Sequence, residues 1–227
     1  VLDVASGTAV IAKSTAASTV ADTISANIQL NDNLRITNDA TAATGVLVVS
    51  GTLSGGGMGV TKTGVGLVRF VGAQAYDGAT TITSGTLQLG SGASGGNGSV
   101  SGGIVNNGWL NFNNADAQSF SDTSYSGTGG LVKTGGGALN LTGSSWVVQR
   151  LFVNTGSTAF AAGATVSVGS GSNDSLYVGT GYNGVVNTNA ILDLSSVASL
   201  NASVGRLYVG VGDSATGAGA QGIGTLR

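Results

Sequence analysis

The chain has 227 residues, among which 41 are glycine and none is proline, cysteine or histidine. The absence of cysteine and histidine excludes thiol catalysis, histidine-activated serine nucleophiles and the usual zinc sites. Charged residues make up only 8% of the chain and the net charge is −2, which excludes a basic surface that follows a nucleic acid backbone.

The predicted secondary structure consists of short strands. Glycine, serine, threonine and asparagine interrupt most segments of the chain and disfavour helices, so that only residues 12–24 have a composition compatible with a helix. Apolar residues make up 41% of the chain, which is enough to fill a core. Six segments place two apolar side chains on the same face of a strand, in chain order residues 87–89, 110–112, 139–141, 176–178, 192–194 and 207–209.

One segment occurs twice without a gap, at residues 59–72 and 130–143, and the two copies lie 71 positions apart. Both copies contain the pattern Lys-Thr-Gly-x-Gly. It consists of Lys62, Thr63, Gly64 and Gly66 in the first copy and of Lys133, Thr134, Gly135 and Gly137 in the second. A repeat at a fixed spacing indicates stacked structural units.

Stacked units of short parallel strands predict an all-β fold, a right-handed parallel β-helix. A spacing of 71 residues corresponds to three coils of about 24 residues, so the whole chain would form roughly ten coils. We expect Lys62 and Lys133 to project from similar corners, three coils apart, and to have a structural role. The alternative fold is a β-sandwich or jelly roll, which is also built from short strands and turns.

The repeated motif resembles the autotransporter-associated β-strand repeat of bacterial passenger domains, in which Gly-Gly-Leu-x-Lys-Thr-Gly-x-Gly precedes an aromatic residue and a Thr-x-Ile segment. The first copy continues through Tyr76, Thr80 and Ile82, so the resemblance covers residues 55–92, and the second copy covers residues 126–163. The resemblance implies a parallel β-helix that is exported to the bacterial surface. The motif itself carries no catalytic residue.

We interpret residues 1–227 as a single β-helix segment and expect it to be a fragment of a longer exported protein. Residues 165–227 are predicted to continue the solenoid with glycine-rich loops, because Leu-Tyr-Val-Gly at residues 176–179 returns 31 positions later at residues 207–210. No run of 18 or more apolar residues occurs, so we expect no transmembrane segment in this chain.

Aspartates are the remaining candidates for catalysis, because β-helix polysaccharide enzymes use clustered carboxylates as calcium ligands or as acid and base. Asp116, Asp122, Asp193 and Asp213 are scattered and form no Asp-x-Asp cluster. We therefore expect turn residues, no catalytic residue and no metal. Three matches to Gly-x-Gly-x-x-Gly lack the strand-to-helix context of a dinucleotide site, so no cofactor is expected.

Aromatic residues are the candidates for ligand contact. Trp109, Trp146 and Tyr182 are predicted to contact a ligand, because an exposed aromatic strip stacks on sugar rings; the alternative for each ring is a place in the core. Strand alternation puts Trp109 on the face opposite Leu110. The asparagines at residues 106–114 are expected to form hydrogen-bonded ladders in turns.

These patterns favour a non-enzymatic β-helix scaffold, the stalk or passenger segment of an autotransporter-like protein, that serves adhesion or surface display. The expected location is extracellular or on the bacterial cell surface, associated with the outer membrane. The expected partners are host-surface or matrix glycans and proteins. We expect no nucleic acid partner. The first alternative is a filament subunit that associates end to end through unpaired edge strands. The second is a carbohydrate-binding or polysaccharide-degrading β-helix.

Overall fold

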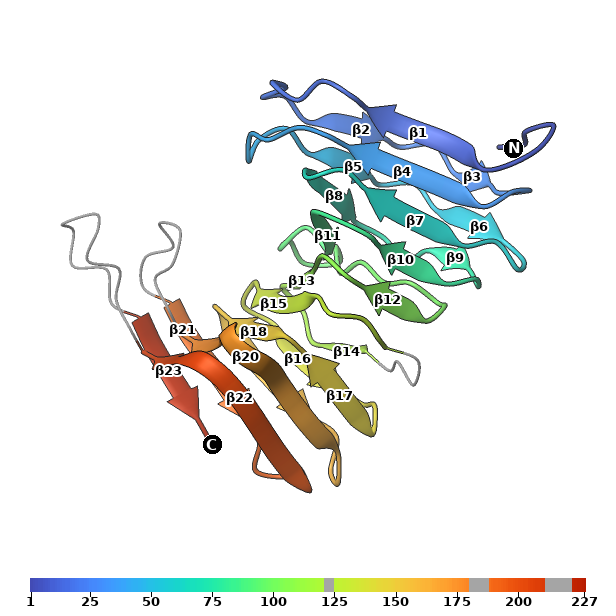
Figure 1. The fold of residues 1–227 in the computed structure, drawn as a ribbon. Coiled ribbons are helices and arrows are strands. Elements are labelled where there is room, and N and C mark those ends of the chain that lie inside the picture. The colour runs from blue at the N-terminus through green and yellow to red at the C-terminus, as the bar shows by residue number, and fades with distance from the viewer. Residues whose placement is uncertain (121–124, 180–187, 211–221) are drawn as a thin grey trace.

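The computed structural model describes residues 1–120, 125–179, 188–210 and 222–227. In these ranges the chain forms 23 strands and no helix. The strands form four sheets, and the pairings within each sheet are parallel (Figure 1). Parallel pairing requires each strand to return in the same direction after a connection.

The largest sheet, which we call the spine sheet, has ten strands and runs through most of the chain. Its strands are β2 (Asp22–Ile24), β5 (Leu47–Val49), β8 (Leu67–Phe70), β11 (Thr86–Leu89), β13 (Trp109–Asn113), β15 (Gly130–Thr134), β17 (Ser145–Val148), β18 (Arg150–Val153), β20 (Thr165–Val178) and β22 (Ser199–Val209).

Three smaller sheets flank the spine sheet. The N-terminal sheet contains β1 (Ala9–Lys13), β4 (Leu34–Asn38), β7 (Val60–Thr63), β10 (Thr80–Ile82) and β12 (Ile104–Asn106). The C-terminal sheet contains β14 (Gln118–Phe120), β16 (Ala138–Leu141), β19 (Gly156–Phe160), β21 (Thr188–Asp193) and β23 (Gly222–Leu226). A small sheet contains β3 (Ile28–Gln29), β6 (Leu53–Gly55) and β9 (Ala75–Tyr76).

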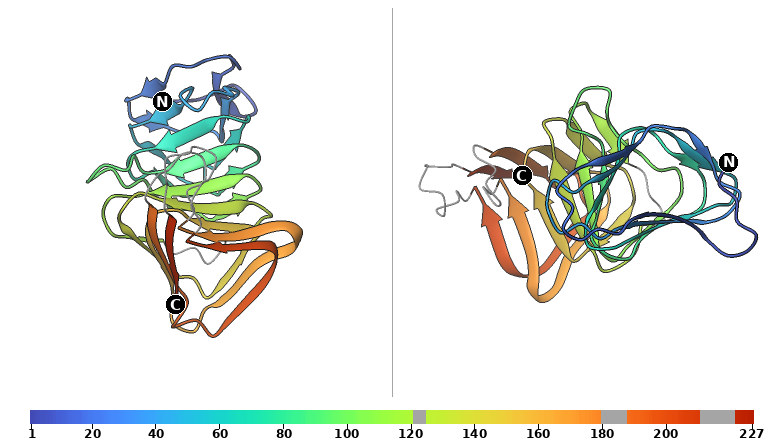
Figure 2. Two further views of the ribbon diagram at one scale, coloured as in Figure 1. Left: turned by 90° about the vertical axis from the view of Figure 1, so that its left-hand side faces the viewer. Right: turned by 90° about the horizontal axis from the view of Figure 1, so that it is seen from above.

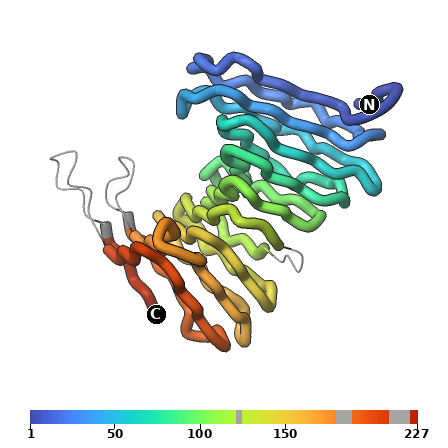
Figure 3. The backbone as a smooth tube through the Cα atoms, viewed as in Figure 1, coloured from blue at the N-terminus to red at the C-terminus, as the bar shows by residue number. Residues whose placement is uncertain are grey.

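The chain visits these sheets in rotation, and we call one such round a layer. The first three layers run from the N-terminal sheet to the spine sheet and then to the small sheet, as β1–β2–β3, β4–β5–β6 and β7–β8–β9. From β13 onward the rounds pass between the spine sheet and the C-terminal sheet. The backbone tube shows the layers in sequence order, with the two termini at opposite ends (Figure 3). Seen from above, the segments of the first half lie nearly over one another (Figure 2).

The spine sheet carries a continuous inward column of apolar side chains. Its members are stacked in register and are all buried: Leu47, Val68, Leu87, Leu110, Leu131, Leu151 and Leu176. Along each strand these inward residues alternate with outward ones, which is the geometry that the alternating sequence pattern predicts. Burial of the column removes apolar surface from water and stabilises strands that are too short to persist alone.

The last strand of the spine sheet continues this column but leaves its apolar side chains exposed. Leu207 stacks on Leu176 and is 55% exposed. In the part of the chain that the structure describes, β20 is the one spine-sheet strand that pairs with β22. This end of the stack therefore presents an apolar edge.

The structure confirms that the protein is all-β with parallel strands. The six predicted segments all fall in strands, although β21 ends at Asp193, one residue before the end of the predicted segment. Residues 12–24 contain the end of β1 and the whole of β2 and form no helix. The recurrence at 31 residues corresponds to direct stacking, because Leu176 pairs with Leu207.

The interpretation of the 71-residue repeat was wrong in one respect. Lys62 lies in β7 of the N-terminal sheet, whereas Lys133 lies in β15 of the spine sheet, so the two lysines do not project from similar corners of the stack. The spacing between stacked residues also varies, from 19 positions between Val68 and Leu87 to 34 positions between Thr165 and Ser199. The repeat therefore does not correspond to a whole number of layers.

The turn after β15 requires glycine at its first position. Gly135 has φ = +79°, and a Cβ atom there would collide with the carbonyl oxygen of Asn114 in the previous layer. The next residue, Gly136, has no positive φ, and a Cβ atom on it would meet nothing within 4 Å. The two neighbouring glycines therefore form a matched pair for substitution.

We predict that Gly135→Ala lowers the free energy of unfolding by about 2 kcal/mol, because a left-handed backbone disfavours an L residue and the added Cβ must displace the neighbouring layer. Gly136→Ala is the control and should change it by less than about 0.5 kcal/mol. Urea unfolding followed by circular dichroism gives both values. Equal free energies of unfolding for the two variants would contradict the requirement for glycine at position 135.

Candidate functional site

Two lysines occupy inward positions in columns that are otherwise largely apolar. Lys133 is stacked between Phe112 and Val153 and is completely buried. Lys62 is stacked between two isoleucines and is 1% exposed. Neither ammonium group reaches the surface, so both must find hydrogen-bond acceptors inside the stack.

Lys62 satisfies its ammonium group with backbone carbonyls of the following corner. Its Nζ atom donates to the carbonyl oxygens of Thr63 at 3.0 Å, Gly64 at 2.6 Å and Ser84 at 2.9 Å. Ser84 lies 22 residues later, in the next layer. All three donors of the ammonium group are used, and two layers are connected through one side chain.

Lys133 repeats this arrangement in a different sheet. Its Nζ atom donates to the carbonyl oxygens of Thr134 at 2.7 Å, Gly135 at 2.7 Å and Thr155 at 3.2 Å, again with the third acceptor 22 residues later. The Lys-Thr-Gly-x-Gly motif therefore specifies a local corner that is independent of the side of the stack on which it lies.

An asparagine of the previous layer supports each of these corners. The Nδ2 atom of Asn38 donates to the carbonyl oxygen of Leu67 at 2.7 Å, and that of Asn114 donates to the carbonyl oxygen of Ala138 at 2.9 Å. In both copies the acceptor is the residue after the second glycine of the motif. Both asparagines are completely buried.

A third asparagine forms the same support where the motif has no lysine. The Nδ2 atom of Asn106 donates to the carbonyl oxygen of Gly130 and to the hydroxyl oxygen of Tyr125, both at 3.0 Å. These contacts confirm the hydrogen-bonded turns expected for residues 106–114. The sequence analysis did not connect them to the motif, although each asparagine precedes a Gly-x-Gly pair by 21 to 26 positions, such as Asn38 before Gly64 and Asn114 before Gly135.

Trp109 lies on the outer face of the spine sheet, as its alternation with Leu110 predicts. Leu110 is completely buried and Trp109 is half-buried. The indole ring lies across Gly130 of the next strand, where a Cβ atom would collide with the ring. The guanidinium carbon of Arg150 lies 5.5 Å from the ring centroid, within the range of a cation–π contact.

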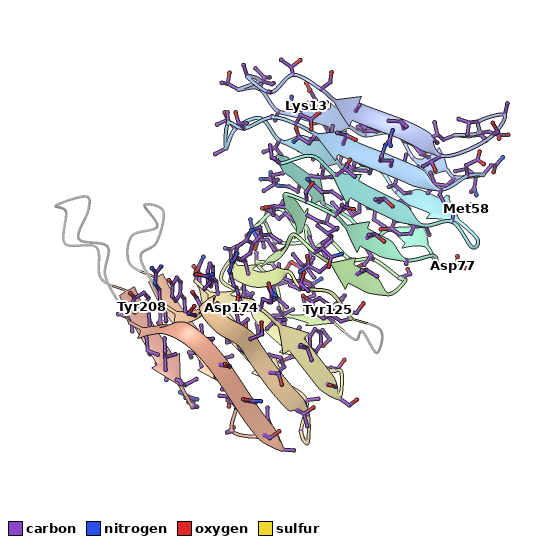
Figure 4. All side chains as sticks on the ribbon, viewed as in Figure 1. Lys13, Met58, Asp77, Tyr125, Asp174 and Tyr208 are labelled. Atoms are coloured by element: carbon purple, nitrogen blue, oxygen red, sulfur yellow. The ribbon has the colours of Figure 1, made fainter. Side chains whose placement is uncertain are left out.

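Further aromatic rings continue from Trp109 along the sheet. The centroids of Trp109 and Phe152 are 5.3 Å apart, and Phe152 stacks on Tyr177 with centroids 4.6 Å apart and an interplanar angle of 10°. Tyr208 follows at 4.9 Å and is 41% exposed. Tyr208 lies in the C-terminal half of the molecule, where Figure 4 also labels Asp174. We call these four rings, with Arg150 and Arg206, the aromatic face.

Two hollows of the surface meet at this face. Trp109 and Arg150 line both of them. The first hollow has a volume of about 360 Å³ and is lined mainly by hydroxyl, amide and glycine backbone groups, including Asn107 and Gln149. The second has a volume of about 280 Å³ and includes Arg206 together with Phe152 and Tyr177. Together they make this face the candidate binding surface.

The other two aromatic candidates do not join the aromatic face. Trp146 is completely buried, packs near Phe120 and Phe160, and donates its Nε1–H to the carbonyl oxygen of Gly143 at 3.1 Å. It fills the core, so its assignment as a ligand contact was wrong. Tyr182 lies outside the described residues.

The two candidate aspartates that the structure describes, Asp116 and Asp193, accept local hydrogen bonds. Asp116 accepts hydrogen bonds from the backbone N–H of Gly95 at 2.6 Å and from the hydroxyl of Ser94 at 2.9 Å, which lower the pKa of its carboxyl group. Ser195 does the same for Asp193. A general acid needs a raised pKa, so these shifts have the opposite sign.

Asp122 and Asp213 lie outside the described residues. In the part of the chain that is described, no group of three or more His, Cys, Asp or Glu residues is placed to hold a metal ion. The described residues also contain no helix that is long and apolar enough to cross a membrane.

Comparison with known proteins gives one partial match. A segment of 58 residues, 26% of this chain, is 50% identical to the Adhesin BmaC autotransporter of Brucella suis biovar 1 (strain 1330). The match spans 2% of the length of that adhesin. No protein-family model matches the chain, and no solved structure matches it.

We predict that Lys133→Met lowers the free energy of unfolding by about 2 kcal/mol, because three buried carbonyl oxygens lose their donor. Arg35→Met, at an exposed position of β4, is the control for loss of a positive charge and should change it by less than about 0.5 kcal/mol. Urea unfolding measures both. Wild-type stability in Lys133→Met would show that the hydrogen bonds contribute nothing.

We also predict that the stability of the protein depends on pH through the two buried lysines. Burial lowers the pKa of Lys62 and Lys133 to about 8 from the ordinary value of 10.5, although Asp39 partly opposes the shift for Lys62. Above pH 8 the unfolded chain therefore binds more protons at these groups than the native chain does, so the free energy of unfolding should rise with pH. The rise should be measurable up to about pH 9.5, below the range in which tyrosines ionise.

The matched control is the double variant Lys62→Met/Lys133→Met. The free energy of unfolding of this variant, measured in urea at the same pH values, should rise less steeply with pH, because the contribution of the two lysines is absent. If the wild-type and the double variant have the same pH dependence, the two ammonium groups keep their ordinary pKa inside the stack.

Proposed function

We propose that this chain is a non-catalytic, right-handed β-helix segment in the passenger of an autotransporter-like adhesin, displayed on the outer surface of a bacterium. The observation that carries the proposal is the 58-residue segment that is 50% identical to an autotransporter adhesin. Parallel strands that return in rotation to the same sheets support the β-helix assignment.

The physical properties of the stack suit a displayed scaffold. Each layer adds about 4.8 Å to its length, so a modest number of residues extends a rigid element away from a membrane. The inward spine-sheet column from Leu47 to Leu176 is apolar in every layer, whereas the outward residues differ, as Arg69, Asn111 and Phe152 on the same sheet illustrate. The core therefore holds the shape, and the outer face is free to carry binding groups.

A second candidate function is self-association into a filament. The exposed apolar side chains of β22 favour it, since Leu207 and Val209 continue columns that are buried in the layers before them. A second copy stacked on this edge would bury them and pair the open strand.

Adhesion is tested by displaying residues 1–227 on a non-adherent bacterium and counting the bacteria that attach to cultured host cells. We expect attachment well above that of bacteria displaying an unrelated β-rich passenger at the same density, verified with an antibody to a shared tag. Attachment no greater than the control, at equal display, would refute the adhesive function.

Self-association is tested by sedimentation velocity and electron microscopy of the purified chain over a range of concentrations. Filaments that disappear in Leu207→Asp and persist in the control Val147→Asp, an exposed valine of β17, would support stacking through β22. Monomers at every concentration would refute it.

A further inference from the structure

We propose that the aromatic face binds an acidic glycan, with sugar rings packed against the aromatic side chains and carboxylate or sulfate groups paired with Arg150 and Arg206. The inference rests on the proposed adhesive function, because it names the chemical class of partner that the scaffold would bind.

The register of the spine sheet brings the required groups into one strip. Trp109, Gly130, Arg150, Ser175 and Arg206 are stacked in register on five successive strands, on the outward side of the sheet; Gly130 and Ser175 are themselves buried, and the other three side chains reach the surface. At about 4.8 Å per strand, the four steps span roughly 19 Å. A strip of this length fits several linked sugar units better than a single small molecule.

The aromatic side chains provide apolar surface in a fixed position. Trp109 is held across the sheet because Gly130 has no Cβ atom, and Phe152 is packed against the next ring. Both rings are half-buried, so each is fixed by its neighbours and still reaches the surface. Rings in such positions offer their π-systems to the C–H groups of a sugar at little cost in side-chain entropy.

The arginines provide the charge preference. Arg206 is exposed and forms no ion pair with any residue that the structure describes. The Arg150 side chain is 40% exposed, and its Nε atom lies 4.0 Å from a carboxylate oxygen of Asp174. The other oxygen of Asp174 accepts the backbone N–H of Ser170 at 2.7 Å, so the carboxylate is held in place, and it approaches Arg150 through Nε and not through the terminal amino groups. A planar guanidinium pairs with carboxylate or sulfate through two parallel hydrogen bonds.

The polar lining of the adjoining hollow favours a glycan over an acidic peptide. Asn107 and Gln149 place amide groups beside Trp109, where the hydroxyl groups of a sugar would find donors and acceptors. A peptide would bind most readily by adding a strand to an open sheet edge. The strands that carry Trp109 and Arg150 are paired on both sides, so the part of the face beside the polar hollow offers no such edge; the open edge lies at β22, beyond this hollow.

The test is titration of the purified 227-residue chain with acidic oligosaccharides, followed by calorimetry and tryptophan fluorescence. The probes are a sulfated heparin octasaccharide, a hyaluronan octasaccharide that carries carboxylates alone, neutral cellohexaose, and poly-glutamate as an acidic peptide. Because the chain has two tryptophans and Trp146 is buried, a change in fluorescence on binding reports on Trp109. We expect binding of at least one acidic oligosaccharide, and comparison of the first two probes identifies the anionic group that is recognised.

The variants separate a specific site from general attraction to charge. Arg150→Gln/Arg206→Gln should weaken binding by about tenfold or more, because two charge-assisted contacts are lost. Arg35→Gln, on an exposed position of the N-terminal sheet, removes the same kind of charge elsewhere and should leave the affinity unchanged. Trp109→Phe should abolish the fluorescence response and weaken calorimetric binding, and circular dichroism checks that each variant is folded.

Three results would overturn the inference. They are binding of neither acidic oligosaccharide, binding of cellohexaose or poly-glutamate with equal affinity, and equal loss of affinity in Arg35→Gln and in the double arginine variant. Attachment in the bacterial display assay together with any of these results would leave the adhesive function in place and refute the glycan site alone.

Discussion

Parallel pairing in register along the spine sheet is the constraint on which the other features of the molecule depend. Strands of three to five residues bury little surface alone, and they are stable because each adds side chains to inward columns that continue above and below. The same pairing decides which outward residues become neighbours. Trp109, Arg150 and Arg206 meet on one face because successive strands are aligned, although they are distant in the sequence.

Polar side chains inside the stack are compatible with parallel pairing because some of their hydrogen bonds run from one layer to the next, as the backbone hydrogen bonds of paired strands do. Lys133 interrupts an apolar column, yet its three donors are all used, one of them in the next layer. Asn114 reaches from the layer before to the same corner. Each corner is therefore connected to the layers on either side through side chains as well as through the backbone, which makes the buried polar groups part of what fixes the register.

Much of the fold was predictable, because the sequence pattern that creates it is local. Alternating apolar residues at 110–112 and 176–178 predicted strands with one apolar face, and the 31-residue recurrence, from which continued stacking was expected, corresponds to the pairing of Leu176 with Leu207. The fate of Trp146 was not predictable, since its inward position depends on the pairing of β17 with β20, which the sequence around it does not reveal. The arginines of the aromatic face were missed for the same reason: Arg150 and Arg206 become neighbours of Trp109 through the register of five strands, and no spacing in the sequence signals it.

The Lys-Thr-Gly-x-Gly corner joins the N-terminal sheet to the spine sheet between β7 and β8, and it joins the spine sheet to the C-terminal sheet between β15 and β16. The same corner, with the strand that precedes it, thus occurs on two different sides of the stack. Its duplication or loss would turn everything that follows by one side about the long axis while leaving each corner chemically intact. Changes in repeat number would in this way alter which outward side chains lie above one another on each side of the stack.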